Sequence, residues 1–276
     1  MSRVRLALAA LLAALTPACG ASASPPVLAA PTVKAGSMAR FIAHVHHLYA
    51  LDGSTLATYR LRDDGTPELV SSQRVDGDPE TLFPYGELLF VGTQAGMRVY
   101  SLAEPDRPNA IGVAEHLRSC DPVVVENDVA YVTLRSGSRC RGGRDALLIF
   151  DVTDPTRPVE IGGQPLPSPH GLGIDGDSLF VADARDGLLV FDVRDPRQPR
   201  LVGRAPDIQG YDVIAHGGVL VVSAEDGIYQ YAYGPEGVTR TTPLSVIPVG
   251  DRGNALQLEP PPSTEPPQPD FAEPPP

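Results

Sequence analysis

An apolar triplet recurs five times along the chain at a nearly fixed period. Successive copies lie 41, 41, 49 and 41 residues apart. They begin at Leu48, Leu89, Ala130, Leu179 and Leu220. A proline keeps the same step, at Pro67, Pro108, Pro158 and Pro199. A repeat of about 40 residues that is built from short strands is typical of a β-propeller, with one blade for each repeat.

The fourth repeat predicts the layout of one blade. Apolar and β-branched runs predict strands at 171–175, 179–183, 188–193 and 200–204. The pairs Gly176-Asp177 and Asp186-Gly187 and the proline-bounded segment 195–199 predict the turns between them. We therefore expect an all-β fold, a five-bladed β-propeller of four-stranded antiparallel blades with disordered tails. A sixth blade from the N-terminal segment stays open as an alternative, although that segment holds few strand-forming residues.

Composition divides the chain into four segments. Residues 1–18 predict a signal peptide, because two arginines precede a short apolar run that is followed by small residues. Residues 19–37 predict a lipid-anchored flexible linker, and residues 38–250 hold the repeats. Residues 251–276 are rich in proline and predict a disordered tail. No later apolar run is long enough to predict a transmembrane helix.

The three cysteines predict two different modifications, a lipid anchor and a disulfide. The segment that ends at Cys19 resembles a bacterial lipoprotein cleavage site, so we expect Cys19 to be lipidated; an ordinary secreted protein is the alternative. Gly20 follows it where an aspartate would suggest inner-membrane retention, which favours the outer membrane or cell surface over the periplasm. Cys120 and Cys140 then form an even pair that can make a disulfide in an oxidising compartment, with two free thiols as the alternative.

The charge of the chain excludes one class of partner. The formal net charge is −12, and no extended basic stretch offsets it. Nucleic acid is not an expected partner, because phosphate binding needs clustered lysine and arginine. The expected partners are the membrane, through the lipid anchor, and an unknown envelope protein or polar ligand.

Two repeats resemble a known family. Residues 147–152 read Leu-Leu-Ile-Phe-Asp-Val and precede an Asp-Pro turn at 154–158, and residues 188–193 with the turn at 195–199 repeat this pattern. This pattern resembles the LVIVD repeat; the second copy is weaker, and the first and fifth are degenerate. The resemblance implies an exported or surface propeller of bacteria or archaea, a family in which most members have no assigned activity.

The repeat register brings a set of polar residues to one place. The positions nine residues before each triplet are Ala39, Glu80, Asp121, His170 and Tyr211. They open the innermost strand of each blade, at the mouth of the central channel. Their carboxylate, imidazole and phenol groups predict a ligand-binding ring. A solvated channel mouth with no ligand is the alternative.

Three further sequence patterns resemble functional sites. Arginines in a long turn could contact an anion, or form a solvated loop: Arg135, Arg139, Arg141 and Arg144. The histidines His44, His46 and His47, with His216, are expected in exposed turns of the opposite face rather than in a zinc site. The glycines at 171, 173 and 176 match a dinucleotide-binding pattern, but they lie in a strand and turn rather than before a helix.

Two functions from different classes follow. The first is a non-enzymatic envelope lipoprotein that acts as a binding or scaffold module for a protein or polar ligand, with no cofactor and no bound metal. The second is a metal-assisted hydrolase or lyase, with Glu80, Asp121 and His170 as metal ligands or acid–base groups.

Overall fold

The computed structural model describes residues 35–115, 122–136, 144–234, 237–238 and 241–249. All of them fall in one compact unit, 34–276. These residues form strands and turns. No helix that could cross a membrane occurs among them. Several predictions concern residues outside the described ranges: the signal peptide, most of the linker, the tail, and the side chains of Cys19, Cys120, Asp121, Arg139, Cys140 and Arg141.

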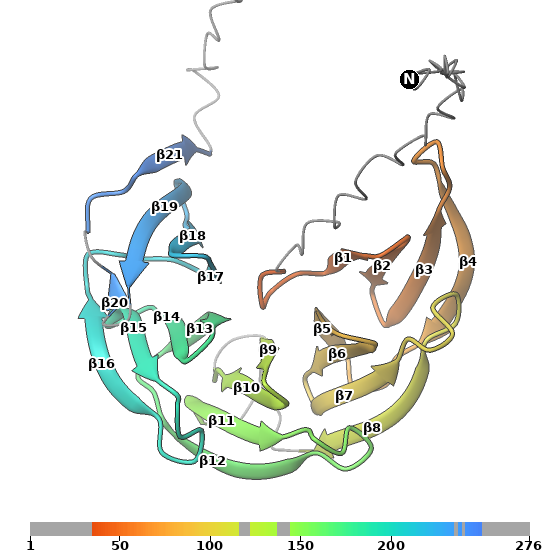
Figure 1. Ribbon diagram of the computed structural model, residues 1–276, viewed down its shortest axis with the longest axis horizontal. Helices are drawn as coiled ribbons and strands as arrows, with labels where there is room; N and C mark the ends of the chain where they lie inside the picture. Colours follow the sequence, from red (N-terminus) through yellow and green to blue (C-terminus); the bar gives the residue numbers. More distant parts are fainter. Residues whose placement is uncertain (1–34, 116–121, 137–143, 235–236, 239–240, 250–276) are drawn as a thin grey trace, which may run out of the picture. The chain divides into compact units, whose positions relative to one another are not determined.

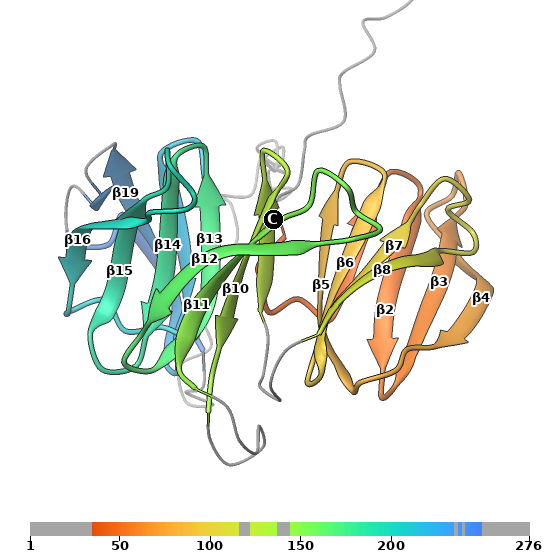
Figure 2. The same ribbon diagram turned by 90° about the horizontal axis from the view of Figure 1, so that it is seen from below.

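The strands form five antiparallel sheets, which are the blades of a five-bladed β-propeller (Figures 1 and 2). Blade 1 holds β1 (Phe41–His44), β2 (His47–Asp52), β3 (Thr55–Leu61) and β4 (Pro67–Arg74). Blade 2 holds β5 (Pro79–Tyr85), β6 (Leu88–Thr93), β7 (Gly96–Ser101) and β8 (Asn109–Glu115). Blade 3 holds β9 (Val123–Glu126), β10 (Val129–Leu134), β11 (Ala146–Asp151) and β12 (Val159–Pro165).

Blade 4 holds β13 (Pro169–Asp175), β14 (Ser178–Asp183), β15 (Gly187–Asp192) and β16 (Arg200–Ala205). Blade 5 holds β17 (Asp212–His216), β18 (Val219–Ser223), β19 (Gly227–Gly234) and β21 (Ser245–Pro248), and the short β20 (Gly237–Val238) also pairs with β19. The expected fold is confirmed, and the four strands expected in the fourth repeat lie within two residues of those observed.

The apolar triplets form the second strand of each blade, and in the three central blades neighbouring blades cover both faces of this strand. Leu179, Phe180 and Val181 in β14 are fully buried, as are Leu89, Phe90 and Val91 in β6. A strand that packs on both faces reads as a continuous apolar run rather than as an alternating one. The repeated triplets therefore mark, in the sequence, the residues that form the core of the propeller.

The proline-bounded turn of each central repeat packs on the outer strand of the blade before it. In blade 1, Ser71 Oγ donates to the carbonyl of Asp106 (2.6 Å) and Gln73 Nε2 donates to that of Pro108 (2.8 Å). Between blades 2 and 3, a Cβ on Gly112 would overlap the carbonyl oxygen of Pro155. The turn thus joins consecutive blades as well as consecutive strands.

Asp106 adds a polar link between blades 1 and 2. Its carboxylate accepts from His47 Nε2 at 2.7 Å and pairs with Arg60, and these contacts hold the pKa of Asp106 below its usual range. His44 is half-buried and His46 is exposed, but His47 is buried. The expectation of exposed turn histidines is therefore wrong for His47, because the turn of blade 2 covers its side chain.

The segment that precedes β1 connects blade 5 to blade 1, two blades whose described strands make no extensive contact with each other. Strands of consecutive blades pack together from blade 1 to blade 5, but no described strand pair makes a contact of similar extent between blade 5 and blade 1. Instead Ser37 Oγ donates to Asp212 Oδ1 and accepts from the amide of Leu172, both at 2.8 Å. The amide of Leu82 donates to the carbonyl of Ala39 at 2.8 Å.

This connection corrects one expected boundary. We expected the linker to extend through Ser37, but Ser37 is fully buried, and the segment from Ala35 contacts the inner strands of blades 2, 4 and 5. A small polar residue such as Ser37 carries no hydrophobic signal, so no sequence pattern indicates this burial. The terminal blades keep large apolar side chains exposed, with Phe41 71% and Ile247 56% accessible.

Apolar side chains close the centre of the propeller. Innermost strands of four blades meet there around Ala35, and the cavity that remains measures about 10 Å³. This volume is about the smallest that can hold one water molecule. Its other lining residues are Phe83, Val124, Gly173, Ile174, Ile214 and Ala215. A ligand of more than a few atoms therefore has to bind away from this point.

Candidate functional site

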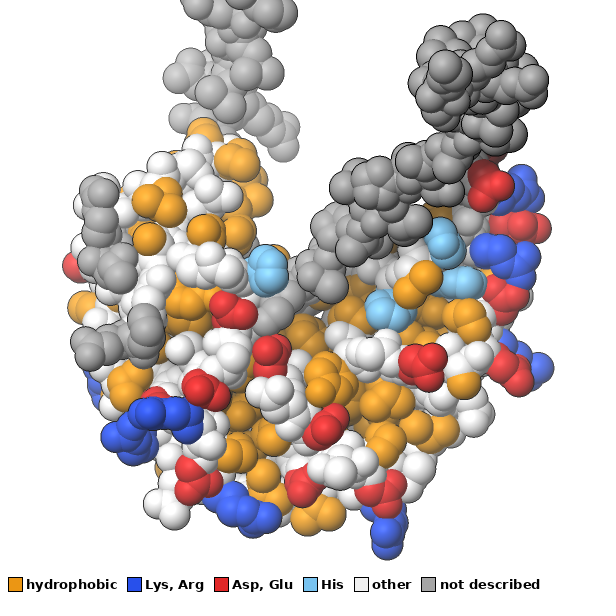
Figure 3. All heavy atoms as spheres, viewed as in Figure 1, with side chains coloured by type: hydrophobic (Ala, Val, Ile, Leu, Met, Phe, Trp, Pro, Cys, Tyr) orange, Lys and Arg blue, Asp and Glu red, His pale blue; other side chains and the backbone are white. Residues whose placement is uncertain are grey.

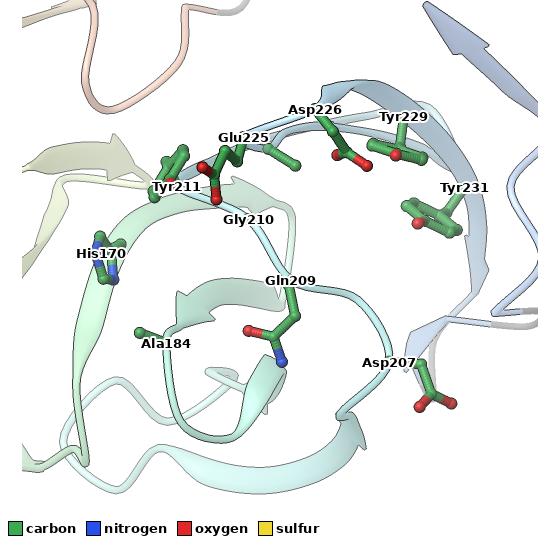
Figure 4. A pocket seen from close by; sticks show the side chains of 11 residues that line it. His170, Ala184, Asp207, Gln209, Gly210, Tyr211, Glu225, Asp226, Tyr229 and Tyr231 are labelled. Atoms are coloured by element: carbon green, nitrogen blue, oxygen red, sulfur yellow. The ribbon is translucent and has the colours of Figure 1, made fainter. Parts of the chain in front are cut away.

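A cavity of about 600 Å³ lies where blades 4 and 5 meet (Figure 4). It falls in the volume range of small-molecule sites. Its lining residues come from the start of β13, the turn after β14, the link from β16 to β17, the β18–β19 hairpin and β19 itself. They are His170, Ala184, Asp207, Gln209, Gly210, Tyr211, Ala224, Glu225, Asp226, Tyr229 and Tyr231.

His170 and Tyr211 are neighbours in the lining of this cavity. Their ring centroids are 5.9 Å apart, with the planes tilted by 54°. The amide of Gly171 donates to the carbonyl of Tyr211 at 2.8 Å, which ties β13 to the segment that enters β17. Thr133 Oγ1 donates to the carbonyl of His170 at 2.6 Å, so blade 3 also holds this position. Three blades therefore hold the backbone of these two residues.

The glycines of the apparent dinucleotide motif explain how the blades approach so closely. A Cβ on Gly173 would lie 2.6 Å from the carbonyl oxygen of Val213, and a Cβ on Gly171 would overlap the Asp212 side chain. Neither position has a positive φ. These glycines are needed for the close packing of β13 against β17, which agrees with the expectation that the motif has no nucleotide role.

The imidazole of His170 stays neutral at neutral pH. Burial lowers its pKa below the usual value, and the positive charge of Arg135 lowers it further. The ring Nδ1 lies 3.2 Å from the carbonyl oxygen of Ser168. A neutral imidazole that faces a cavity can accept or donate a hydrogen bond or act as a base.

Aromatic and acidic side chains from blade 5 form the other part of the cavity. The rings of Tyr229 and Tyr231 are stacked, with centroids 6.3 Å apart and planes 16° from parallel. They lie two residues apart on β19 and hence on the same face of the strand. A hydrogen bond to Asp226 raises the pKa of Tyr229. Figure 4 shows Tyr211, Glu225, Asp226 and Tyr229 along one side, with His170, Ala184 and Gln209 across from them.

The candidate site residues proposed from the sequence do not all lie together in the structure. His170 and Tyr211 line the same cavity, whereas Glu80 accepts from Gln94 Nε2 at 3.0 Å and is not among the lining residues. Arg135 acts electrostatically on His170. Arg144 lies elsewhere on blade 3, in a shallow hollow with Glu160. The cavity is therefore an off-axis site between two blades.

Sequence reasoning missed the part of the site that the β18–β19 hairpin and β19 contribute. Glu225, Asp226 and Gly227 occupy the hairpin that corresponds to Arg185, Asp186 and Gly187 in blade 4. In a four-stranded meander, this hairpin lies at the same end of the blade as the start of the first strand. The alternation of strand direction could therefore have placed Glu225 and Asp226 beside His170. The position of Asp207 and Gln209 had no such signal, because their segment follows no repeat pattern.

Within the described ranges, no group of three or more His, Cys, Asp or Glu side chains is arranged to hold a metal ion. Figure 3 shows the face on which the β1–β2 hairpin ends, with histidines over β1 and β2, carboxylates nearer the centre and basic side chains toward the rim. Since hairpins at the two ends of a strand open on opposite faces, the cavity lies at the other end of the blades.

Comparisons with known proteins support the fold. The sequence model of the LVIVD repeat matches residues 170–207, which are β13 to the end of blade 4. A periplasmic gluconolactonase of Pseudomonas aeruginosa has a similar structure, with a TM-score of 0.57 and 19% identity over 74% of this chain and 68% of that one. No curated protein sequence matches the chain significantly.

Two structures of proteins named without a function are equally similar. A protein from Lactobacillus plantarum has a TM-score of 0.59 and 15% identity over 74% of this chain and 69% of its own. A functionally unknown protein from Desulfotomaculum acetoxidans has a TM-score of 0.58 and 13% identity over 75% and 68%. At these identities the similarity shows the propeller fold alone.

Proposed function

We propose that the chain is an exported, lipid-anchored β-propeller of the bacterial envelope that binds a polar ligand, or a polar group of a protein, without catalysis. The cavity between blades 4 and 5 carries this proposal. It combines a volume suited to a small ligand with convergent aromatic, imidazole, amide and carboxylate groups. Hydrogen bonds from blades 3 and 5 hold the His170 strand in place, so the site is largely preformed.

The first experiment is a ligand screen with matched variants. We expect Tyr211→Ala and His170→Ala to weaken binding at least tenfold for any ligand that raises the melting temperature of the full-length chain, because both rings face the cavity. Tyr211 is 47% exposed, so its truncation should leave the fold intact. The measurement is titration calorimetry on hits from a thermal-shift panel of glycans, peptides and small polar compounds.

His46→Ala is the control, since His46 is an exposed histidine of the opposite face. It should leave every affinity unchanged. Equal affinities in the wild type and both cavity variants would place binding elsewhere and refute the assignment of this cavity.

Export and lipidation are proposed from the N-terminal sequence, and the periplasmic location in the name of one structural neighbour agrees with export. We expect the mature protein to begin at acylated Cys19 and to sediment with membranes. Cys19→Ala should move it to the soluble fraction, because two or more acyl chains give firm membrane attachment. Membrane fractionation and the mass of the N-terminal peptide measure this, and an unmodified Cys19 would contradict the lipid anchor.

A hydrolase at the same place is the second candidate, favoured by the neutral imidazole of His170. The gluconolactonase activity in the name of one structural neighbour makes sugar lactones a suitable substrate to assay. Glu80, which the enzymatic hypothesis also requires, is bonded to Gln94 and does not line the cavity. Lactone hydrolysis that is lost in His170→Ala would favour the enzyme over the binding module.

A further inference from the structure

We infer that the cavity between blades 4 and 5 selects a ligand carrying a positively charged amine or guanidinium group. The inference rests on the proposed binding function and names the ligand class of that same site. Three features support it: the charge of the lining, the arrangement of its aromatic rings, and the neutrality of its one imidazole.

The lining carries negative charge that the described structure does not neutralise. Asp207, Glu225 and Asp226 contribute carboxylates, and no lysine or arginine is among the lining residues that the structure describes. The ion pairs between described residues use other acids, namely Asp106, Glu68, Asp154, Asp192 and Asp186. A partly enclosed site with uncompensated carboxylates concentrates a field that attracts cations.

His170 does not offset this charge. Burial lowers its pKa, so the ring is neutral at neutral pH, and the lining then keeps its full negative charge. Arg135 lies near enough to His170 to affect this pKa but is not part of the lining. Among the described lining residues, an anionic ligand would therefore meet three carboxylates and no cation.

The aromatic rings add a second cation-binding element. Tyr229 and Tyr231 stack in parallel beside Asp226, and Tyr231 is held in place by burial, with 6% of its surface accessible. The π-electrons of a tyrosine ring attract an ammonium or guanidinium group that lies within about 6 Å of the ring face, and the attraction is strongest where water is excluded. The Tyr229–Tyr231 pair can offer its outer ring face to the cation while the carboxylates neutralise it.

The same chemistry could come from a basic peptide side chain or from a free polyamine. The probes are therefore acetyl-arginine amide and spermidine, with acetyl-citrulline amide as the neutral isostere of arginine and glutamate as the anion. All are titrated into the full-length chain. We expect the cationic probes to bind at least tenfold more tightly than citrulline, and glutamate not to bind. Tighter binding of the arginine amide than of spermidine indicates a peptide source, and the reverse order a polyamine.

The variant Glu225→Gln/Asp226→Asn keeps the shape of the lining and removes two charges. We expect this variant to bind the cationic probes at least tenfold more weakly than the wild type and to bind acetyl-citrulline amide with unchanged affinity. Glu160→Gln, an exposed acid on β12, is the control and should have no effect. Raising the salt concentration should weaken cation binding to the wild type more than to the double variant.

The outcomes separate this inference from the proposed function. Equal binding of arginine and citrulline, or an unaffected double variant, would overturn the cation selectivity. If a neutral or anionic ligand instead binds and loses affinity in Tyr211→Ala, the binding function stands and only the ligand class is wrong. If no compound of any charge binds, both proposals fail.

Discussion

Gly173→Ala should destabilise the propeller by more than about 2 kcal/mol, because the added Cβ would press against the backbone of β17. It would lie 2.6 Å from the carbonyl oxygen of Val213 and 3.1 Å from the amide nitrogen of Ala215. Both contact atoms belong to a paired strand, so relief requires the two blades to move apart. Overpacking of this kind costs typically 1–3 kcal/mol and occasionally more.

Gly162→Ala is the matched control for this prediction. Gly162 lies in β12 and has no positive φ either, and its Cβ would lie 3.2 Å from the carbonyl oxygen of Arg197 in a turn. We expect a change within about 1 kcal/mol there, because alanine also restricts the unfolded chain. Urea denaturation followed by circular dichroism measures both variants. A Gly173→Ala variant as stable as Gly162→Ala would show that β13 and β17 are not held in close contact.

Gly173 also shows where the sequence is informative and where it misleads. The spacing of glycines at 171, 173 and 176 matches a nucleotide motif by letters, and only the strand pattern around it argues against that function. The strands themselves could be placed within two residues, because turn residues and continuous apolar runs mark their ends. That the glycines allow two blades to meet depends on the packing of distant segments, which local sequence does not encode.

The terminal blades show a second limit. Blades 1 and 5 keep the apolar triplet but have lost the Asp-Pro turn, and they are the blades that lack an extensive strand contact with each other. Terminal repeats are often atypical because they have a neighbour on one side only. In blade 5, β20 packs against β16 at the place where the turn would lie. The degenerate copies could therefore indicate an interrupted interface, but not the segment that bridges it.

Ser37 and the cavity residues escaped prediction for the same reason. A serine next to a proline- and alanine-rich stretch reads as linker, and its burial depends on Asp212 and Leu172, more than 130 residues away. Asp207 and Gln209 likewise face the cavity from a connection that has no periodic pattern. Repeats predict what every blade shares, whereas the candidate site depends on what only two blades have.

Protonation of the buried Asp212 carboxyl should contribute stability to the propeller at pH 5 that is absent at pH 7.5. Burial raises the pKa of Asp212 to about 6, although Ser37 Oγ and the amide of Met38 donate to its carboxylate. The unfolded chain has the ordinary value near 3.8. The folded state therefore binds the proton more tightly. The stability contributed by this proton is fully present below about pH 4 and is lost as the pH rises through about 6.

The size of this effect follows from the shift. About two pKa units correspond to about 3 kcal/mol between pH 4 and pH 7.5, as an upper limit for one group. Carboxyls with lowered pKa values, such as Asp106, act in the opposite direction but only below about pH 4. The interval from pH 5 to pH 7.5 therefore reports mainly on Asp212 and on histidines.

Asp212→Asn isolates the contribution of the carboxyl. The amide oxygen can still accept from Ser37, so the connection to the N-terminal segment survives while the titrating group is gone. We expect the difference in unfolding free energy between pH 5 and pH 7.5 to shift by about 1–2 kcal/mol relative to the wild type, and Asp207→Asn, an exposed acid, to change nothing. An unaltered pH dependence in Asp212→Asn would mean that Asp212 is ionised and solvated in the folded chain. The carboxyl of Asp212 would then not be buried where the N-terminal segment meets blade 5.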